Sequence, residues 1–191
     1  MEPFDSHFAR LYQRIGVPVQ TTSAALLARA IAARSALGSQ PHTDCWETWG
    51  IDRAAFAAVT SAIEAARTAR ERAYAPYSNF RVGAAVLDVH QQVWVGANVE
   101  NASYGLTLCA ERAALCAAQV GGAGSVMLLC VVADTPEPIA PCGACRQWII
   151  ELAPSAIVAM ISTHQGERWL PAAELLPFAF DRNMFHPSRE H

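Results

Sequence analysis

The sequence contains no lysine and no long hydrophobic run. Its longest apolar stretch, from Val126 to Ala133, is eight residues long, whereas a helix that spans a bilayer needs roughly 18–20. The sequence therefore predicts no membrane-spanning helix. The first residues include Glu2 and Asp5 and lack a compact apolar stretch, which argues against a secretory signal peptide. We expect a cytoplasmic protein that does not bind membranes.

Clusters of basic residues are also missing. The 14 basic residues, all arginine, are outnumbered by 17 acidic ones, and the net charge is −3. Nucleic-acid-binding domains usually present a basic face to the phosphates, so we expect no nucleic acid as partner. Residues 6–43 carry four arginines and no acid, a composition that resembles a transit peptide. An ordinary amphipathic helix in an arginine-rich sequence is the favoured interpretation.

The length and composition indicate one globular domain. A chain of 191 residues matches roughly the size of a single domain. The apolar fraction of 52% can build a core, and the charged fraction of 16% is too low for a disordered protein. Six cysteines without export signals argue against a disulfide framework.

Hydrophobic periodicity predicts an N-terminal helical extension at residues 1–50, followed by a domain at 51–191. In the extension a helix runs from Thr21 to Leu37, and Trp46 and Trp49 are expected to pack on the domain. The predicted elements of the domain are a helix from Asp52 to about Tyr74, strands at 81–89 and 92–98, a helix at 108–120, a strand at 125–133, a helix at 143–152, a strand at 156–162 and a short helix at 171–176. Helices that alternate with buried strands imply an α/β fold with helices on the faces of a sheet. The strands at 81–89 and 92–98 are close enough in the sequence to form a hairpin, so the sheet is expected to be mixed.

Three cysteines are predicted to bind one zinc ion per chain. Cys109 opens one predicted helix, and Cys142 and Cys145 open the next in the segment Pro-Cys-Gly-Ala-Cys. Three protein ligands and one open position are typical of a catalytic zinc site, whereas four ligands are typical of a structural one. Zinc lowers the pKa of a water in the open position to about 7.

Glu111 and Arg112 follow Cys109 directly. Glu111 is not a predicted ligand, and its carboxylate is well placed to take a proton from the activated water and pass it on. Arg112 can donate hydrogen bonds to the thiolate sulfurs as an outer-shell residue of the site. The pattern His-x-Glu…Pro-Cys-x-x-Cys, with cysteine allowed in place of histidine, is that of zinc-dependent base deaminases.

The other cysteines and the histidines have simpler interpretations. A lone Cys-x-x-Cys also fits a structural zinc site or a redox pair, but the accompanying Cys-Ala-Glu-Arg makes either less favoured. Cys116 and Cys130 are expected to be small core residues, and Cys45 is structural or incidental. The scattered histidines are expected at the surface.

Four segments, two of which contain the clustered cysteines, give the sequence a close resemblance to the short-chain cytidine deaminases. Together with a similar tail they run in order from about residue 52 to 181: residues 77–85 (YSNFRVGAA), 98–105 (NVENASYG), 109–112 (CAER), 141–147 (PCGACRQ) and the tail 174–180 (ELLPFAF). The resemblance implies a three-layer α/β/α fold with a mixed central sheet. It also implies hydrolytic deamination of cytidine and 2′-deoxycytidine in pyrimidine salvage, with Glu111 as the proton shuttle.

The resemblance assigns substrate contacts to individual positions. Asn98 and Glu100 would bind the ribose hydroxyls, and Phe80 would lie against the nucleoside. The backbone of Ala110 would hold the base, and Ala102 lies in the same substrate-binding segment as Glu100. In a purely structural interpretation, Asn98 is instead a turn residue, and the aromatic residues Phe80 and Phe180 belong to the core.

Residues Tyr104 and Phe180 resemble side chains that such enzymes contribute across a subunit interface, which implies a homo-oligomer, with a tetramer favoured over a dimer. The chain departs from the family by about fifty extra N-terminal residues and by the bulky Phe178. Both features bear on the oligomer contacts and the size of the pocket.

Three alternatives to cytidine deamination remain at this point. The same zinc chemistry would serve a deaminase of another aminated nucleoside, such as an aminonucleoside antibiotic, although the Asn98 and Glu100 pair favours a ribose. A polynucleotide cytidine editor is disfavoured by the acidic balance of the chain. A purely structural zinc module is disfavoured by Glu111 beside an open coordination position.

Overall fold

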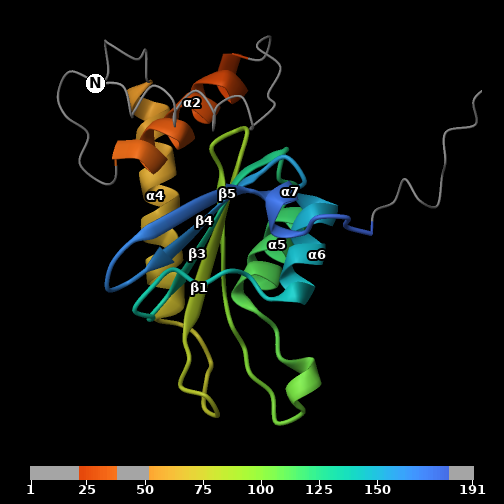
Figure 1. Cartoon of the computed structure of the whole chain (residues 1–191). Coiled ribbons are helices and arrows are strands. Elements are labelled where there is room, and N and C mark those ends of the chain that lie inside the picture. Colours follow the sequence, from red (N-terminus) through yellow and green to blue (C-terminus); the bar gives the residue numbers. More distant parts are fainter. Residues whose placement is uncertain (1–21, 38–51, 181–191) are drawn as a thin grey trace, which may run out of the picture.

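The computed structural model describes residues 22–37 and 52–180, which fold around one five-stranded sheet (Figure 1). The strands are β1 (Val82–Asp88), β2 (Val93–Ala97), β3 (Val126–Ala133), β4 (Ile157–Ser162) and β5 (Glu167–Pro171). Their order in the sheet is β2-β1-β3-β4-β5. Only β3 and β4 are parallel to each other, and the other neighbouring pairs are antiparallel. The sheet is therefore mixed, as predicted.

Helices cover both faces of the sheet (Figure 1). One face carries α2 (Thr22–Leu37) and α4 (Arg53–Arg70), and the other carries α5 (Ala110–Val120), α6 (Gly143–Leu152) and α7 (Ala172–Leu175). Alternate side chains of the buried strands supply the two cores: Ala85 and Leu87 of β1 face α4, whereas Ala84 and Val86 face α5. This arrangement confirms the predicted three-layer α/β/α fold.

The N-terminal helix α2 packs into the same core as the sheet. Its residues Leu27 and Ile31 are fully buried in a cluster with α4 and strands β1, β3, β4 and β5. Arg34 is 2% exposed, and its guanidinium donates two hydrogen bonds of 2.9 Å to the carboxylate of Glu167 on β5. The same guanidinium lies 5.9 Å from the ring centroid of Trp169. The predicted helix is thus confirmed, and it completes the outer layer beside α4.

Helix α4 begins where the sequence predicts and ends earlier. The carboxylate of Asp52 caps it by accepting a hydrogen bond of 2.7 Å from the Ala55 N–H. The predicted end near Tyr74 is wrong, because the helix stops at Arg70. Tyr74 instead donates its N–H to the Asn98 carbonyl and accepts from the Glu100 N–H. This bridge to the chain beyond β2 takes the place of the last helical turn.

Two smaller differences lie at the far edge of the sheet. Strand β5 was not among the predicted elements. The helix predicted from Pro171 is α7, which begins one residue later because Pro171 still belongs to β5. Cys45, Trp46 and Trp49, whose roles were predicted from the sequence, lie outside the described residues.

Glycine at two strand positions lets helices approach the sheet closely. A methyl carbon added at Gly83 would lie 2.0 Å from the Ala66 carbonyl oxygen of α4. One added at Gly96 would lie 2.3 Å from the Ala114 nitrogen and 2.5 Å from the Ala110 oxygen of α5. The absence of a side chain at Gly96 therefore sets where the first turn of α5 lies.

None of the helices in the described ranges 22–37 and 52–180 is sufficiently long and apolar to cross a bilayer.

Candidate active site

The three cysteines predicted as ligands meet where two helices begin. Cys109 is the N-cap of α5, Cys142 is the N-cap of α6, and Cys145 lies in the first turn of α6. The sequence reaches this arrangement because β3 connects α5 to α6 and returns the chain to the end of the sheet at which α5 began. Both helix N-termini, each with a partial positive charge, therefore point at the sulfurs.

The sulfur positions fit a tetrahedral zinc ion. Their three Sγ atoms all lie within 4.8 Å of one another, and the Sγ atoms of Cys109 and Cys142 are 3.8 Å apart. With Zn–S bonds of about 2.3 Å, two sulfurs of a tetrahedral site lie roughly 3.8 Å apart. The described cysteines are free thiols. No other group of three or more metal-ligating side chains occurs in the described part of the chain.

Neighbouring donors favour a thiolate at Cys109. Hydrogen bonding from the Cys145 thiol, supported by Arg112, lowers the pKa of Cys109 to about 5. The same hydrogen bond, followed by burial, raises the pKa of Cys145. A thiol binds a metal ion as the thiolate, so a bound ion would displace any proton that these sulfurs hold.

Glu111 lies beside the sulfurs and is nearly closed off from solvent. Its side chain is 5% exposed in the first turn of α5. Burial is the main cause that raises the pKa of the Glu111 carboxyl, and the charge of Cys109 adds to it, although hydrogen bonds from its own N–H and from Cys145 act in the other direction. A carboxyl whose pKa is raised holds a proton more readily, which suits it to accept a proton and return it.

Arg112 connects the sulfur cluster to the neighbouring loop. Its Nη2 donates to Cys109 Sγ at 3.6 Å and to the Thr107 carbonyl at 2.8 Å. The hydrogen bond to Cys109 also raises the pKa of the arginine, which stays charged. Because Thr107 lines the adjacent pocket, this one side chain holds the pocket wall and the cluster together.

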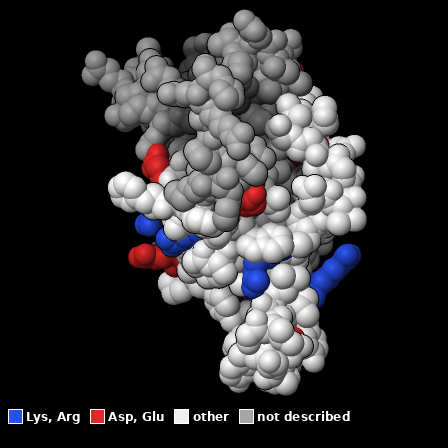
Figure 2. Space-filling model, turned by 90° about the vertical axis from the view of Figure 1, so that its right-hand side faces the viewer, with Lys and Arg blue, Asp and Glu red and all other residues white. Residues whose placement is uncertain are grey.

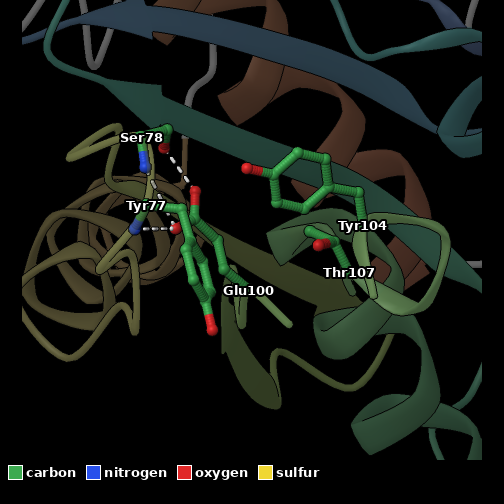
Figure 3. Close-up of a pocket in the computed structure, with 5 residues that line it drawn as sticks. All are labelled: Tyr77, Ser78, Glu100, Tyr104 and Thr107. Atoms are coloured by element: carbon green, nitrogen blue, oxygen red, sulfur yellow. Dashed lines mark hydrogen bonds between the residues drawn. The ribbon is translucent and has the colours of Figure 1, made fainter. Parts of the chain in front are cut away.

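That pocket has a volume of about 360 Å³ and is lined by Tyr77, Ser78, Glu100, Tyr104 and Thr107. Figure 3 shows the Glu100 carboxylate between the backbone of Tyr77 and Ser78 and the ring of Tyr104. Glu100 accepts hydrogen bonds from the Tyr77 N–H at 2.8 Å, the Ser78 N–H at 3.2 Å and the Ser78 hydroxyl. The rings of Tyr77 and Tyr104 meet edge to face at 6.0 Å.

Asn98 lies next to this pocket but does not line it. Its side chain is 8% exposed and bridges the backbone ahead of β1, because Oδ1 accepts from the Val82 N–H and Nδ2 donates to the Phe80 carbonyl, both at 2.8 Å. Asn98 and Glu100 thus hold two halves of the same loop, residues 77–82. One N–H of the Asn98 amide remains for another acceptor.

The aromatic residues predicted from the sequence are exposed in a single chain. Phe80 is 40% exposed, Tyr104 74% and Phe180 56%. Ala102 is exposed too, whereas Ala110 is buried at the start of α5. The tail that carries Phe180 is held on α6, where Gln147 Nε2 donates to the Phe180 carbonyl at 2.7 Å. Single exposed aromatic side chains are common on protein surfaces.

Charged side chains are sparse on the face shown in Figure 2, and its arginines do not gather into a patch. The lower lobe in this view is almost uncharged. A surface that follows a phosphate backbone would need a basic stripe. On this face the described residues form none.

A family model described as the cytidine and deoxycytidylate deaminase zinc-binding region matches residues 57–161. The match covers more than half of the chain and includes all three clustered cysteines and Glu111. The chain belongs to the cytidine deaminase family. The family model and the three clustered cysteines therefore both indicate zinc as the metal of this site.

Two known members of the cytidine deaminase family align over nearly their full lengths. The cytidine deaminase of Halalkalibacterium halodurans is 51% identical over 119 residues, which are 62% of this chain and 90% of the relative. That of Sporosarcina psychrophila is 42% identical over 125 residues, which are 65% and 92% of the two chains.

Solved structures agree with this placement in the cytidine deaminase family. The crystal structure of the cytidine deaminase from Burkholderia pseudomallei superposes with a TM-score of 0.61 at 51% identity and covers 63% of this chain and 98% of its own. The enzyme from Mycobacterium tuberculosis gives a TM-score of 0.57 at 39% identity, with coverage of 64% and 97%. Roughly a third of this chain thus lies outside the shared structure, and α2 precedes the segment that the family model matches.

Three pocket residues had no role in the prediction from sequence. Tyr77 and Ser78 belong to a segment that carries the family resemblance, yet only Phe80 in that segment was expected to contact substrate. A serine two positions before it, next to a proline turn, was the available signal. No signal in the sequence identified Thr107, because its position in the pocket wall is held by a hydrogen bond from Arg112.

Proposed function

We propose that this protein hydrolyses cytidine and 2′-deoxycytidine to uridine and 2′-deoxyuridine with release of ammonia. The observation that carries the proposal is the buried Glu111 beside three sulfurs that fit zinc, next to a pocket with a carboxylate on its wall. Relatives named cytidine deaminase, up to 51% identical, support the same reaction.

In the proposed site Cys109, Cys142 and Cys145 hold the zinc ion. Zinc bound at three sulfurs with one open position supplies a water whose pKa is about 7, which can act as a nucleophile at neutral pH. The two helix N-termini offset the excess negative charge of three thiolates. Arg112 adds a positive charge at Cys109 and keeps that sulfur in place.

Glu111 carries the protons. Its carboxylate takes a proton from the water as the oxygen bonds to C4 of the cytosine ring, and it delivers this proton to N3. The carboxylate then moves the proton of the new C4 hydroxyl to the amine. The C4–N bond breaks, ammonia leaves, and the carbonyl of uracil remains. The closed surroundings of Glu111 keep bulk water from competing for these protons.

The other proposed contacts position the nucleoside. Asn98 and Glu100 bind the ribose hydroxyls, Phe80 lies against the nucleoside, and the Ala110 backbone holds the base. Ala102 also binds substrate, and Tyr104 and Phe180, which are exposed in the single chain, are contributed across a subunit interface. The functional unit would then be a homotetramer, whose mass in solution is the direct test; a dimer is the second possibility.

We further infer that residues 51–191 form the catalytic domain and that the extension at 1–50 adds a helix to its outer layer. The core shared by α2 and α4 supports this division of roles. A place in cytoplasmic pyrimidine salvage follows from the proposed reaction, because deaminated nucleosides re-enter uridine metabolism.

The deciding experiment follows the fall in ultraviolet absorbance of cytidine when purified protein is added, with a chelator-treated sample beside it. We expect zinc-dependent loss, and a fall in kcat of about 10²–10⁴ in Glu111→Gln, the range for general acid–base catalysis. Glu151→Gln, the same change at an exposed position of α6, is the matched control. Full turnover in Glu111→Gln would refute the mechanism. Turnover of blasticidin S or of an oligonucleotide, with none of cytidine, would refute the substrate.

A further inference from the structure

Ser78 occupies a position between two of the proposed substrate-binding residues. Its hydroxyl donates to Glu100 Oε1, and its oxygen accepts from the Phe80 N–H at 3.0 Å. Because the Phe80 N–H is a donor only, the hydroxyl hydrogen is left to point at the carboxylate. One side chain thus fixes the direction of the hydrogen bonds that connect Phe80 to Glu100, of which Figure 3 shows the one to Glu100.

The acceptor sites of Glu100 can be counted. Oε2 accepts from the Tyr77 N–H and the Ser78 N–H, which fills both of its lone-pair directions. Oε1 accepts from the Ser78 hydroxyl and has one direction left. A carboxylate held in this way offers a single, fixed acceptor, and Glu100 lines the pocket in which that acceptor would be used.

We propose that Ser78 is a positioning residue that orients Glu100 so that its one remaining acceptor meets a ribose hydroxyl of the nucleoside. The inference rests on the proposed function, because it needs Glu100 to bind the sugar. Removal of the hydroxyl frees Oε1 to rotate about the hydrogen bonds of Oε2 and leaves the Phe80 N–H without its partner.

The electrostatics of the carboxyl support this role. The Ser78 hydroxyl is the leading cause that lowers the pKa of Glu100, with the Tyr77 and Ser78 N–H groups adding to it and burial opposing it. The carboxyl therefore stays ionised, and an ionised carboxylate only accepts hydrogen bonds. A ribose hydroxyl is a donor of the matching kind.

A purely structural role for Ser78 makes different predictions from a role in positioning. A loosened loop would impair every substrate alike and lower kcat together with affinity. Misorientation of Glu100 would instead weaken only those substrates that have a hydroxyl for it to bind. Cytidine and 2′,3′-dideoxycytidine, which lacks both ring hydroxyls, separate the two cases.

The experiment compares KM and kcat for these two nucleosides in the zinc-loaded wild type and in Ser78→Ala. We expect KM for cytidine to rise about 10-fold, the factor for loss of one hydrogen bond to a charged group, with kcat changed less than about 2-fold. KM for dideoxycytidine should change less than about 2-fold, as expected when the affected group has no partner. Ser78→Thr keeps the hydroxyl and should recover most of the cytidine KM.

Ser155→Ala, at an exposed turn between α6 and β4, is the matched control and should leave both KM values unchanged. Ser78→Cys, which keeps the shape but donates weakly, serves if the alanine variant does not fold, and should show the same selectivity for cytidine at smaller size. Equal losses on both nucleosides would overturn the inference. So would a wild type that binds both nucleosides equally, although its turnover of cytidine would leave the proposed function intact. No turnover of cytidine by the wild type would refute both.

Discussion

The Sγ atoms of Cys109 and Cys142 lie 3.8 Å apart although the residues are 33 positions apart in the sequence. Their closeness depends on β3, which lies between α5 and α6 in the chain and brings both helices to start at the same end of the sheet. Each cysteine is the N-cap of its helix. At this position the free backbone N–H groups of the first turn carry a partial positive charge. The metal site is thus a product of topology as much as of residue type.

Replacement of one ligand should remove the metal. Cys142→Ala leaves two sulfurs, too few for a stable zinc site, so we expect zinc content to fall from about one ion per chain to near zero. Elemental analysis of protein purified without added zinc measures this. Cys116→Ala is the control, because Cys116 lies on α5 outside the cluster. Equal zinc contents in the two variants would exclude Cys142 as a ligand.

The raised pKa of Glu111 predicts a dependence of stability on pH. Its contribution to the free energy of unfolding is full below the unfolded pKa of about 4.3 and is lost as pH rises through the higher folded pKa. Glu111→Gln removes the ionisable group and keeps its shape. Relative to wild type, the variant should therefore gain stability between pH 4 and pH 7.

Urea unfolding of the metal-free proteins at both pH values tests this, because a bound zinc ion would itself lower the pKa of the nearby carboxyl. Glu151→Gln controls for removal of a carboxylate as such, since that side chain is exposed on α6. A Glu111→Gln variant that loses stability relative to wild type as pH rises would show that the carboxylate is stabilised in the folded state, and it would contradict the raised pKa.

The sequence predicted the parts of the site that depend on local order. Cys142 and Cys145 belong to one short segment at a helix start, and the prediction of α6 matches its observed range. The end of α4 could not be predicted, because Tyr74 pairs with residues beyond β2 that no local pattern identifies. Strand β5 was missed for a related reason. It is an edge strand of five residues, and its first residue, Glu167, pairs with Arg34, which is 133 positions earlier in the chain.

Addition of one methyl group to β2 should displace α5 and thereby disturb the site. In Gly96→Ala the new carbon would lie 2.3 Å from a backbone nitrogen of α5, so the helix must move. We expect a loss of about 1–3 kcal/mol in stability from overpacking. A fall in kcat should accompany it, because α5 carries Glu111.

The control for this substitution is Gly105→Ala, where an added carbon has nothing within 4 Å. Urea unfolding should show a change below about 1 kcal/mol for that variant. If Gly96→Ala were as stable and as active as wild type, the close approach of β2 and α5 would not position the site.

The ion pair between α2 and β5 should contribute strongly to stability. Arg34→Met leaves the Glu167 carboxylate partly buried and without its guanidinium, a change that costs about 3–5 kcal/mol for buried pairs. The double variant Arg34→Met with Glu167→Gln should lose less than the two single variants together. Arg29→Met, at an exposed position of α2, should change stability by less than about 0.5 kcal/mol. Equal losses for Arg29→Met and Arg34→Met would contradict the assigned role.

The ion pair between Arg34 and Glu167 also joins two segments that are synthesised at different times. Arg34 and Glu167 are 133 positions apart, so the ribosome releases the helix long before the strand that neutralises its buried charge exists. Chains are synthesised at about 5–20 residues per second. The apolar side of α2 is therefore made on the order of ten seconds before its last partner, and this helix is among the final elements to complete its packing.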